Sequence, residues 1–584
     1  MKQGRNAPCA CGSGEKTKHC CQSISESRPP ASPAELNQLV ALFQAGRYAE
    51  MENRARQFVE RYPDSGIAWK LFGTALGVQG KDALSALQKA AALLPDDVEV
   101  HINLGNVLQD IGQIDGAIVS YRRALGFNPH IAEVHNNLGN ALKDLGQLDT
   151  AVASYRRALN INPQYAEAYN NLGAALHDLG RFDDAVASFR HALEINPSFT
   201  EVYGNLGNAL KDLGCFDDAL ASFRRALEIQ PDSAEVHNNL GAALEALGQA
   251  ADAVASYRRA LEIKPDYADA HSNLAHILLA LGDFEHGWQE YAWRFSRDAA
   301  NVPLPEAMFL LPFTSQGKRI LLCYEQGIGD ELFFLQFAPQ LREQAQWVGY
   351  WSTPKVHSLI ERAGCVNQVF SRLGEAPAWD LIIPVGDLPL LLACNSAAAI
   401  PSSLRFPPTE QAIAKVHQHL SELGLTGQRL LGVTWRAGSP PVPGRPKRLF
   451  KQIGLDLLAD AIKDWKGAIV VLQRKPEAGE IEQLRAQVSC PVHDLSEYND
   501  DLESMQALLD VLDEYVGVSN ANMHLMAGLG KTARVLIPFP AEWRWMASGD
   551  QSPWFPGFTL YRQTVAVGWE EALARLSRDL TDHG

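Results

Sequence analysis

The sequence predicts a protein of three parts: a short zinc knuckle, an all-α solenoid of helical repeats, and an α/β domain built from two Rossmann-like lobes. Three observations lead to this fold class. Four of the nine cysteines fall within the first 21 residues, glycines and prolines then recur every 34 residues, and the C-terminal half alternates short apolar runs with helical patterns. At 584 residues the chain is long enough to bury several cores.

Charge and hydropathy limit the classes of function. The net charge of -16 argues against a dedicated binder of nucleic acid or anionic membrane, because phosphate recognition needs a basic surface. The N-terminus lacks the apolar core of a secretory signal, and no uninterrupted apolar run reaches the ~18 residues of a membrane span. We therefore expect a cytoplasmic protein.

The N-terminal cysteines form the pattern C-x-C, eight residues, then C-C. Four thiolates at this spacing suit tetrahedral Zn²⁺, whose binding would supply the folding energy that so short a segment lacks. A pair of disulfides is the alternative, which a cytoplasmic location and the adjacent third and fourth cysteines disfavour. The predicted metal ligands are Cys9, Cys11, Cys20 and Cys21.

Residues 5–22 resemble the SEC-C motif of many bacterial proteins through R-N-x-P-C-x-C-G-S-G-x-K-x-K-x-C-C. The resemblance implies a zinc-bound protein-interaction knuckle rather than a catalytic metal site. His19 stands where a basic residue is more usual and is a possible competing ligand, although Cys21 fits the spacing better.

Residues 33–296 carry about eight repeats with the tetratricopeptide (TPR) pattern of helix, glycine turn, helix and proline stop. Small residues such as Gly139 and Ala158 should let the paired helices approach closely, while Leu138, Tyr155 and Leu159 fill the interface. Units at both ends of such a stack are expected to be atypical because they cap it.

An asparagine occupies one position of six successive first helices. Because an amide offers both a donor and an acceptor, such a ladder can bind the backbone of an extended peptide without reading its sequence. The alternative is that these asparagines only bridge neighbouring repeats. The pattern resembles the asparagine ladder of eukaryotic O-linked N-acetylglucosamine transferase. The predicted peptide-binding residues are Asn103, Asn137, Asn171, Asn205, Asn239 and Asn273.

The C-terminal half alternates strands and helices, which predicts parallel sheets. We expect one lobe over 305–405, a second over 426–565 and a closing helix over 566–584. The expected strands are 319–324, 346–351, 381–385, 430–435, 468–473, 515–518 and 533–538. A dinucleotide site is not expected at Gly327-Ile-Gly329, because Leu332 stands where its fingerprint needs a third glycine.

The second lobe contains a candidate site for an anion. Ser519 or Asn520 can cap the helix over 523–529, whose free amides suit a pyrophosphate. Arg436 follows a strand end, where α/β sheets bind ligands, and Lys451 belongs to a basic segment of an acidic protein. An anionic donor is the sharper interpretation, and an ordinary capped helix is the plainer one.

Residues 318–565 resemble the domain related to ADP-heptose transferases of glycosyltransferase family nine, which has the GT-B fold. The similarity rests on G-x-G-D at 327–330, S-N-x-N-x-H-L-x-A-G-L-G from 519, E-W-R-W at 542–545 and S-P-W-F-P at 552–556. It implies a glycosyltransferase that moves a sugar from a nucleotide-sugar donor by inverting displacement without a catalytic metal. The absence of Asp-x-Asp from 305–584 agrees with this.

The resemblance also implies roles for single residues. Asp330 would be the base that takes the acceptor's proton, with Glu331 as the nearby rival. Donor phosphates would be stabilised by a helix N-terminus and cations, and His524 would either contact the donor or pack. For Trp543, Trp545 and Trp554, core packing is expected more than stacking on the donor. The predicted donor-binding residues are Arg436, Lys451, Ser519, Asn520, Asn522 and His524.

Two functions remain open. The first is a glycosyltransferase whose repeats recruit a protein acceptor. The second is a TPR adaptor or scaffold with an inactive transferase-like domain, which the departure from the family's acidic residues at Ser519-Asn520 keeps open.

Overall fold

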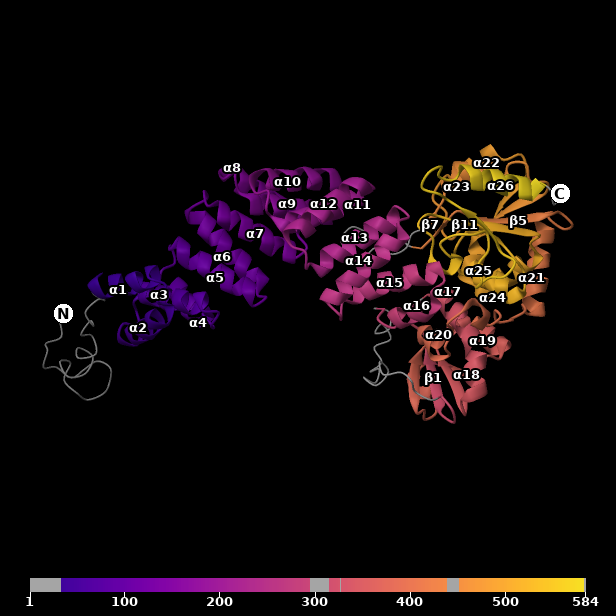
Figure 1. The fold of residues 1–584 in the computed structure, drawn as a ribbon, viewed down its shortest axis with the longest axis horizontal. Helices are drawn as coiled ribbons and strands as arrows, with labels where there is room; N and C mark the ends of the chain where they lie inside the picture. The colour runs from indigo at the N-terminus through magenta and orange to yellow at the C-terminus, as the bar shows by residue number, and fades with distance from the viewer. Residues whose placement is uncertain (1–32, 295–314, 326, 439–450, 582–584) are drawn as a thin grey trace, which may run out of the picture. The chain divides into compact units, whose positions relative to one another are not determined.

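A computed structural model describes residues 33–294, 315–325, 327–438 and 451–581 (Figure 1). The chain divides into two compact units, one ending at Ala209 and the other beginning at Leu210. The four N-terminal cysteines predicted to bind zinc lie outside the described residues. Within the described ranges, no helix is long and apolar enough to cross a membrane.

The repeat region consists of antiparallel helix pairs that follow one another along the chain. The glycine turns between paired helices take positive φ angles, as at Gly146 with φ 72°. The helices are α1 (Pro33–Gln44), α2 (Tyr48–Arg61), α3 (Gly66–Val78), α4 (Leu84–Leu93), α5 (Val98–Asp110), α6 (Ile114–Phe127), α7 (Ala132–Asp144), α8 (Leu148–Ile161), α9 (Ala166–Asp178), α10 (Phe182–Ile195), α11 (Thr200–Asp212), α12 (Phe216–Ile229), α13 (Ala234–Ala246), α14 (Ala250–Ile263), α15 (Ala268–Leu281) and α16 (Phe284–Tyr291).

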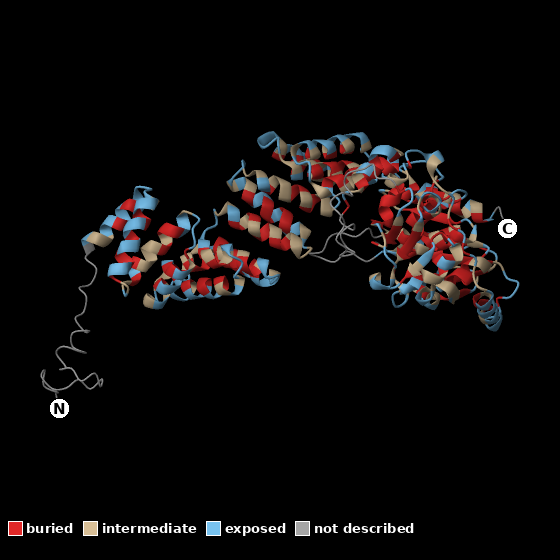
Figure 2. Ribbon diagram, turned by 90° about the horizontal axis from the view of Figure 1, so that it is seen from below, coloured by how far each residue is buried: buried red, intermediate tan, exposed pale blue. Residues whose placement is uncertain are grey.

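A glycine opposite an aromatic ring sets the close approach within a repeat, as predicted. A Cβ added to Gly139 would lie 2.5 Å from Cε1 of Tyr155, so only glycine fits beneath that ring. Tyr155 and Ala158 are fully buried, and Leu138 and Leu159 are nearly so. The buried residues in Figure 2 follow these inner faces, while the outer faces of the repeat helices are exposed.

The last repeat is built into the α/β core of the second unit. Trp288 of α16 is buried, with its ring centroid 5.4 Å from that of Trp543. Arg294, just after α16, donates two hydrogen bonds to Glu325 (2.9 and 2.6 Å) and one to Asp387 (2.7 Å). Because all three side chains are buried, this cluster ties the repeats to the loop that precedes the G-x-G-D turn.

The first lobe contains a four-stranded parallel sheet in the order β3-β2-β1-β4. Its turn at 327–330 leads from β1 into α17, which places Asp330 in the first helical turn. The strands are β1 (Arg319–Cys323), β2 (Trp347–Trp351), β3 (Gln368–Phe370) and β4 (Leu381–Pro384). The helices are α17 (Ile328–Phe334), α18 (Ala338–Gln344), α19 (His357–Ala363) and α20 (Leu388–Leu391).

The second lobe contains a six-stranded parallel sheet in the order β12-β11-β10-β5-β8-β9. Figure 1 shows α22, α23 and α26 on one face of this sheet and α21, α24 and α25 on the other. The strands are β5 (Leu430–Thr434), β8 (Ala468–Val471), β9 (Val492–Asp494), β10 (Glu514–Val518), β11 (Arg534–Ile537) and β12 (Thr559–Arg562), with a separate hairpin of β6 (Arg436–Ala437) and β7 (Lys451–Gln452). The helices are α21 (Glu410–Glu422), α22 (Leu455–Ile462), α23 (Glu480–Gln487), α24 (Leu502–Val511), α25 (Ala521–Leu529) and α26 (Glu570–Thr581).

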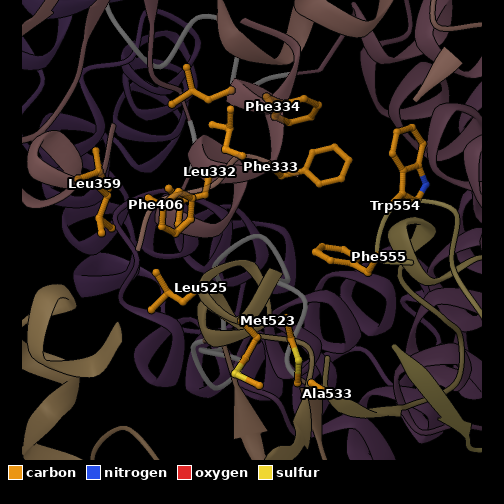
Figure 3. Close-up of a cluster of buried hydrophobic side chains, with 14 of the residues drawn as sticks. Leu332, Phe333, Phe334, Leu359, Phe406, Met523, Leu525, Ala533, Trp554 and Phe555 are labelled. Carbon is orange, nitrogen blue, oxygen red and sulfur yellow. The ribbon is translucent and has the colours of Figure 1, made fainter. Parts of the chain in front are cut away.

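One buried apolar cluster joins the two lobes. Figure 3 shows Phe333 of the first lobe pointing toward Trp554 and Phe555 of the second, with ring centroids 5.2 and 6.3 Å away. The predicted helical repeats and parallel α/β sheets are confirmed, and all seven predicted strands are present to within two residues at each end. The short strands β3, β6, β7, β9 and β12 were not predicted.

Candidate functional site

A cavity of about 760 Å³ opens at the carboxyl ends of the second lobe's strands, where parallel α/β sheets bind ligands. The loops after β5, β8, β10 and β11 supply most of its wall. The first lobe contributes Gly329 and Asp330 from the start of α17. The cavity therefore brings the predicted base together with every predicted donor-binding residue, namely Arg436, Lys451, Ser519, Asn520, Asn522 and His524.

Asparagine side chains shape the N-terminus of α25 at this cavity. Asn520 is the N-cap, and its Oδ1 accepts a 2.9 Å hydrogen bond from the backbone amide of Asn522. The Nδ2 group of Asn520 donates to Thr434 Oγ1 at 2.9 Å. Asn522 is buried and donates to the hydroxyl of Tyr515 at 3.3 Å. These two asparagines therefore build and orient the helix N-terminus with their own side chains.

A chain of alternating charges lines the cavity. Asp330 pairs with Arg544, whose guanidinium also donates to Glu542 at 2.5 Å. The second oxygen of Glu542 accepts from Lys451 at 2.6 Å and from Ser519 at 2.9 Å. The network thus runs from the first lobe to the edge of the α25 N-terminus.

Electrostatics keep this network ionised. Burial alone would raise the pKa of Glu542, but the charges of Lys451 and Arg544 outweigh burial and hold the pKa well below its ordinary value. For Arg544 burial opposes the charged form, and the carboxylates of Asp330 and Glu542 outweigh it and raise the pKa above the ordinary value. Glu542 therefore occupies, as an anion, the position between cations that a ligand's phosphate would also favour.

His524 lies where the two lobes meet. Burial and the charge of Arg544 lower the pKa of His524 to about 3, which keeps the imidazole neutral. A Cβ added to Gly329 would lie 3.2 Å from Cδ2 of His524. Gly329 therefore leaves room for His524 of the opposite lobe, and a larger residue would require the His524 side chain to shift.

Arg436 lines the cavity, but its guanidinium is bonded to other groups of the protein. It forms an ion pair with Glu480 and donates to the carbonyl of Lys475 at 3.1 Å. Burial would raise the pKa of Glu480, and the hydrogen bond from Arg436 reverses this and lowers it. Arg436 thus braces the loop after β8.

The structure separates Asp330 from its rival. Glu331 is buried, accepts a 2.5 Å hydrogen bond from the Tyr350 hydroxyl and another from Ser352, and burial raises its pKa. It does not line the cavity. Asp330 does, so it is the carboxylate of this turn that a ligand would meet.

The aromatic residues near the cavity belong to the core. Trp543, Trp545 and Trp554 are all buried, as expected for packing residues. None of the three lines the cavity.

The asparagine ladder forms, and most of its amides bridge neighbouring repeats. In the first unit Asn171 and Asn205 each donate at 3.0 Å to the asparagine 35 residues earlier, Asn136 and Asn170. In the second unit Asn273 donates to Asn238 at 2.9 Å.

Two earlier asparagines of the ladder also donate to the preceding repeat, but to other acceptors. Asn137 donates to Asn106 and Asn103 donates to Thr74, both at 3.2 Å. Asn239, like the other five rungs, is half-buried. In these five bonds one N–H of each amide serves the solenoid, and each amide group also has a second N–H and an oxygen.

Two functional candidates escaped the sequence reasoning. The sequence pattern includes Glu542 and Arg544 in the E-W-R-W segment but assigns neither residue a role. In the structure they form the centre of the charge network. Their position could have indicated a role, because they follow an apolar strand, β11, at the sheet edge that also carries Ser519. Among the described residues no group of His, Cys, Asp and Glu is arranged to hold a metal ion.

Comparison with protein families assigns the helical region. Models described as TPR repeat match residues 105–146 and 139–180, and models described as tetratricopeptide repeat match 166–199, 199–266 and 268–286. A search of curated proteins finds no match.

Solved structures resemble parts of the chain. MamA is 26% identical over 29% of this chain and 93% of its own, with a TM-score of 0.27. YrrB, described as a TPR protein with an unusual peptide-binding site, is 25% identical over 32% of this chain and 95% of its own (TM-score 0.28). A thermophilic TPR protein of Thermus thermophilus is 26% identical over 31% of this chain and 100% of its own (TM-score 0.27). The chain therefore carries tetratricopeptide repeats, which are protein-binding modules, between residues 105 and 286, and it continues into a parallel α/β region that these family models do not cover.

Proposed function

We propose that the α/β region is a GT-B glycosyltransferase that moves a sugar from a nucleotide-sugar donor to a protein acceptor recruited by the repeats. The observation that carries this proposal is the cavity itself. A helix N-terminus and two cations, Lys451 and Arg544, face one carboxylate of the opposite lobe, Asp330. This is the combination that a displacement at a sugar phosphate needs.

Each group has a chemical task in the proposed reaction. The acceptor oxygen forms a bond to the anomeric carbon while its proton passes to Asp330. The bond from the anomeric carbon to the phosphate oxygen breaks, and the electron pair leaves with the nucleoside diphosphate. Lys451, Ser519 and the amides at the start of α25 stabilise the new negative charge. No step in this scheme requires a metal.

The last repeat supports a protein acceptor. His276 of α15 is exposed, and the end of α15 is joined to the segment after Arg544, where the amide of Ala547 donates to the carbonyl of Ala280 at 2.7 Å. It follows the ladder residue Asn273 by three positions, so both side chains lie on the same face of α15. A polypeptide bound along this face would reach the cavity.

Transfer to a protein tests the proposal directly. The chain is incubated with a cell extract and a panel of UDP-, ADP- and GDP-sugars with a radiolabelled sugar. Label should enter protein with the wild type and be lost with Asp330→Asn. Asp380→Asn, which changes a carboxylate that does not line the cavity, is the matched control. Equal labelling by wild type and Asp330→Asn would refute the assignment of the base.

A specific observation favours an adaptor with an inactive transferase-like domain as the second candidate. Two cations of the cavity, Lys451 and Arg544, already have internal carboxylate partners, in Glu542 and Asp330. A site that is satisfied without ligand is what an inactive domain would retain. Absence of binding to every nucleotide sugar, together with normal capture of protein partners by the repeats, would favour this function.

We further propose that Cys9, Cys11, Cys20 and Cys21 bind one structural Zn²⁺ in a protein-interaction knuckle, on the basis of their spacing. Metal analysis of the purified full chain should give about one zinc per chain. Cys9→Ser should lower this content, and Cys215→Ser, which changes an exposed free cysteine of the repeats, should leave it unchanged. Equal zinc in all three proteins would contradict the assignment.

A further inference from the structure

A pocket of about 320 Å³ in the first unit, lined by residues of α6, α7 and α8, differs from its counterparts in later repeats. Its floor is apolar and includes Leu125, Leu138 and Leu142. Arg122 and Arg157 also line it, and both are exposed. Neither arginine has an ion-pair partner within the described part of the chain.

The later repeats show what is missing here. Their second helices carry a glutamate three residues after a basic residue, and the two side chains pair. The pairs are His191–Glu194 at 3.0 Å, Arg225–Glu228 at 2.6 Å and Arg259–Glu262 at 2.9 Å. The same position is Gly126 in α6, three residues after Arg123, and Asn160 in α8, three residues after Arg157. Arg122 corresponds to Arg190, Arg224 and Arg258, so Gly126 removes an acid beside it rather than its own ion-pair partner.

A second acidic position is also replaced. Thr150 lines the pocket where the following repeats have Asp184, Asp218 and Asp252. The pocket thus keeps its arginines and lacks both acids of the later repeats. Its local charge is positive in a chain whose net charge is -16.

Two further features characterise the pocket. A Cβ added to Gly126 would have no atom within 4 Å, so the glycine leaves the rim open. His135 is 6% exposed, its Nε2 donates to the carbonyl of Pro129 at 3.0 Å, and its Nδ1 has no partner. In the last repeat the corresponding nitrogen of His271 meets Glu290.

We propose that this pocket binds an acidic peptide segment of a partner protein. An aliphatic side chain of the peptide would lie on the leucine floor, and neighbouring carboxylates would pair with Arg122 and Arg157. The site is separate from the asparagine ladder and does not depend on the proposed transferase activity.

Short labelled peptides test the proposal on the full chain by fluorescence anisotropy. The probes are acetyl-Glu-Leu-Glu-Leu-Glu-amide and its charge-reversed form with Lys in place of Glu. The acidic probe should bind and the basic probe should not, and binding should weaken as NaCl is raised. The double variant Gly126→Glu/Thr150→Asp installs acids that later repeats already carry, so the fold should tolerate it.

The expected loss in this variant is about two- to thirtyfold in Kd, because two new charges oppose the ligand at ~0.2–1 kcal/mol for each exposed pair. Gly126→Ala/Thr150→Ser is the matched control and should bind like the wild type. Equal affinity of the double variant and the wild type would overturn the proposal, as would equal binding of both probes or no binding at ~1 mM. Self-association that the double variant abolishes would assign the pocket to a second copy and also overturn it.

Discussion

Replacing Glu542 with Gln should strengthen the binding of nucleoside diphosphates. Glu542 holds Lys451 at 2.6 Å and Arg544 at 2.5 Å, so a diphosphate must compete with this carboxylate for both cations. The side chain of Glu542 is 11% exposed and that of Lys451 17%, so solvent screens the pair only partly. Glutamine keeps the shape and one hydrogen bond but removes the negative charge.

The size of the change in Kd follows from the loss of the Glu542 carboxylate, which competes with the ligand for the two cations. A hydrogen bond to a charged group contributes about 1.5–3 kcal/mol, and 1.4 kcal/mol corresponds to tenfold in Kd. We therefore expect Glu542→Gln to lower the Kd of the preferred nucleoside diphosphate by about tenfold or more. The gain should shrink with added salt, because it is electrostatic.

Isothermal titration calorimetry with UDP, ADP and GDP measures this effect. Glu514→Gln is the matched control, since it breaks a pair with Arg534 (3.0 Å) whose residues do not line the cavity. Lys451→Met should weaken the same ligand. Unchanged or weaker binding in Glu542→Gln would refute the view that this carboxylate occupies the phosphate position.

Three further predictions concern the stability of the fold. Arg294→Gln should lower the free energy of unfolding of the second unit by about 3–5 kcal/mol in urea, because it leaves two buried carboxylates without their cation. A loss below ~1 kcal/mol would contradict the buried network. Because the folded pKa of His524 is about 3, below its ordinary 6.5, the unfolded chain binds this proton first and stability should fall as pH drops from 6.5 toward 3. His524→Asn should flatten that slope, and an unchanged slope in urea titrations would contradict the lowered pKa. Gly139→Ala should lower the free energy of unfolding by about 1–3 kcal/mol in thermal or urea unfolding, because the new Cβ would lie 2.5 Å from the Tyr155 ring. Gly126→Ala is the control and should not destabilise the fold. Equal effects of the two substitutions would contradict the glycine–aromatic packing.

The repeats were the most predictable part of the fold. Their 34-residue period repeats the same helix pair, so the glycine and aromatic positions of one repeat predict those of the next. The longer strands were also predictable, because β5 and β10 are apolar runs buried on both faces. Strands such as β3 and β9 are three residues long and carry polar ends, so periodicity could not reveal them.

The candidate site was predictable in its parts and not in its connections. A strand followed by S-N-x-N indicated a helix N-terminus, and the structure places Asn520 there as the cap. The pairing of Asp330 with Arg544 depends on how the two lobes close on each other, 214 residues apart in sequence. Local pattern carries no information about such a contact. The same applies to Gly329, whose neighbour is His524 of the opposite lobe.

Binding of a nucleotide sugar to the cavity is the central claim, and saturation-transfer difference NMR on the full chain measures it most directly. We expect one member of a UDP-, ADP- and GDP-sugar panel to give a signal with the wild type. That signal should disappear with Lys451→Met and persist with Lys463→Met, whose lysine is exposed and does not line the cavity. A panel in which no nucleotide sugar binds, or in which Lys451→Met binds as well as the wild type, would contradict the proposal that the cavity binds a nucleotide-sugar donor.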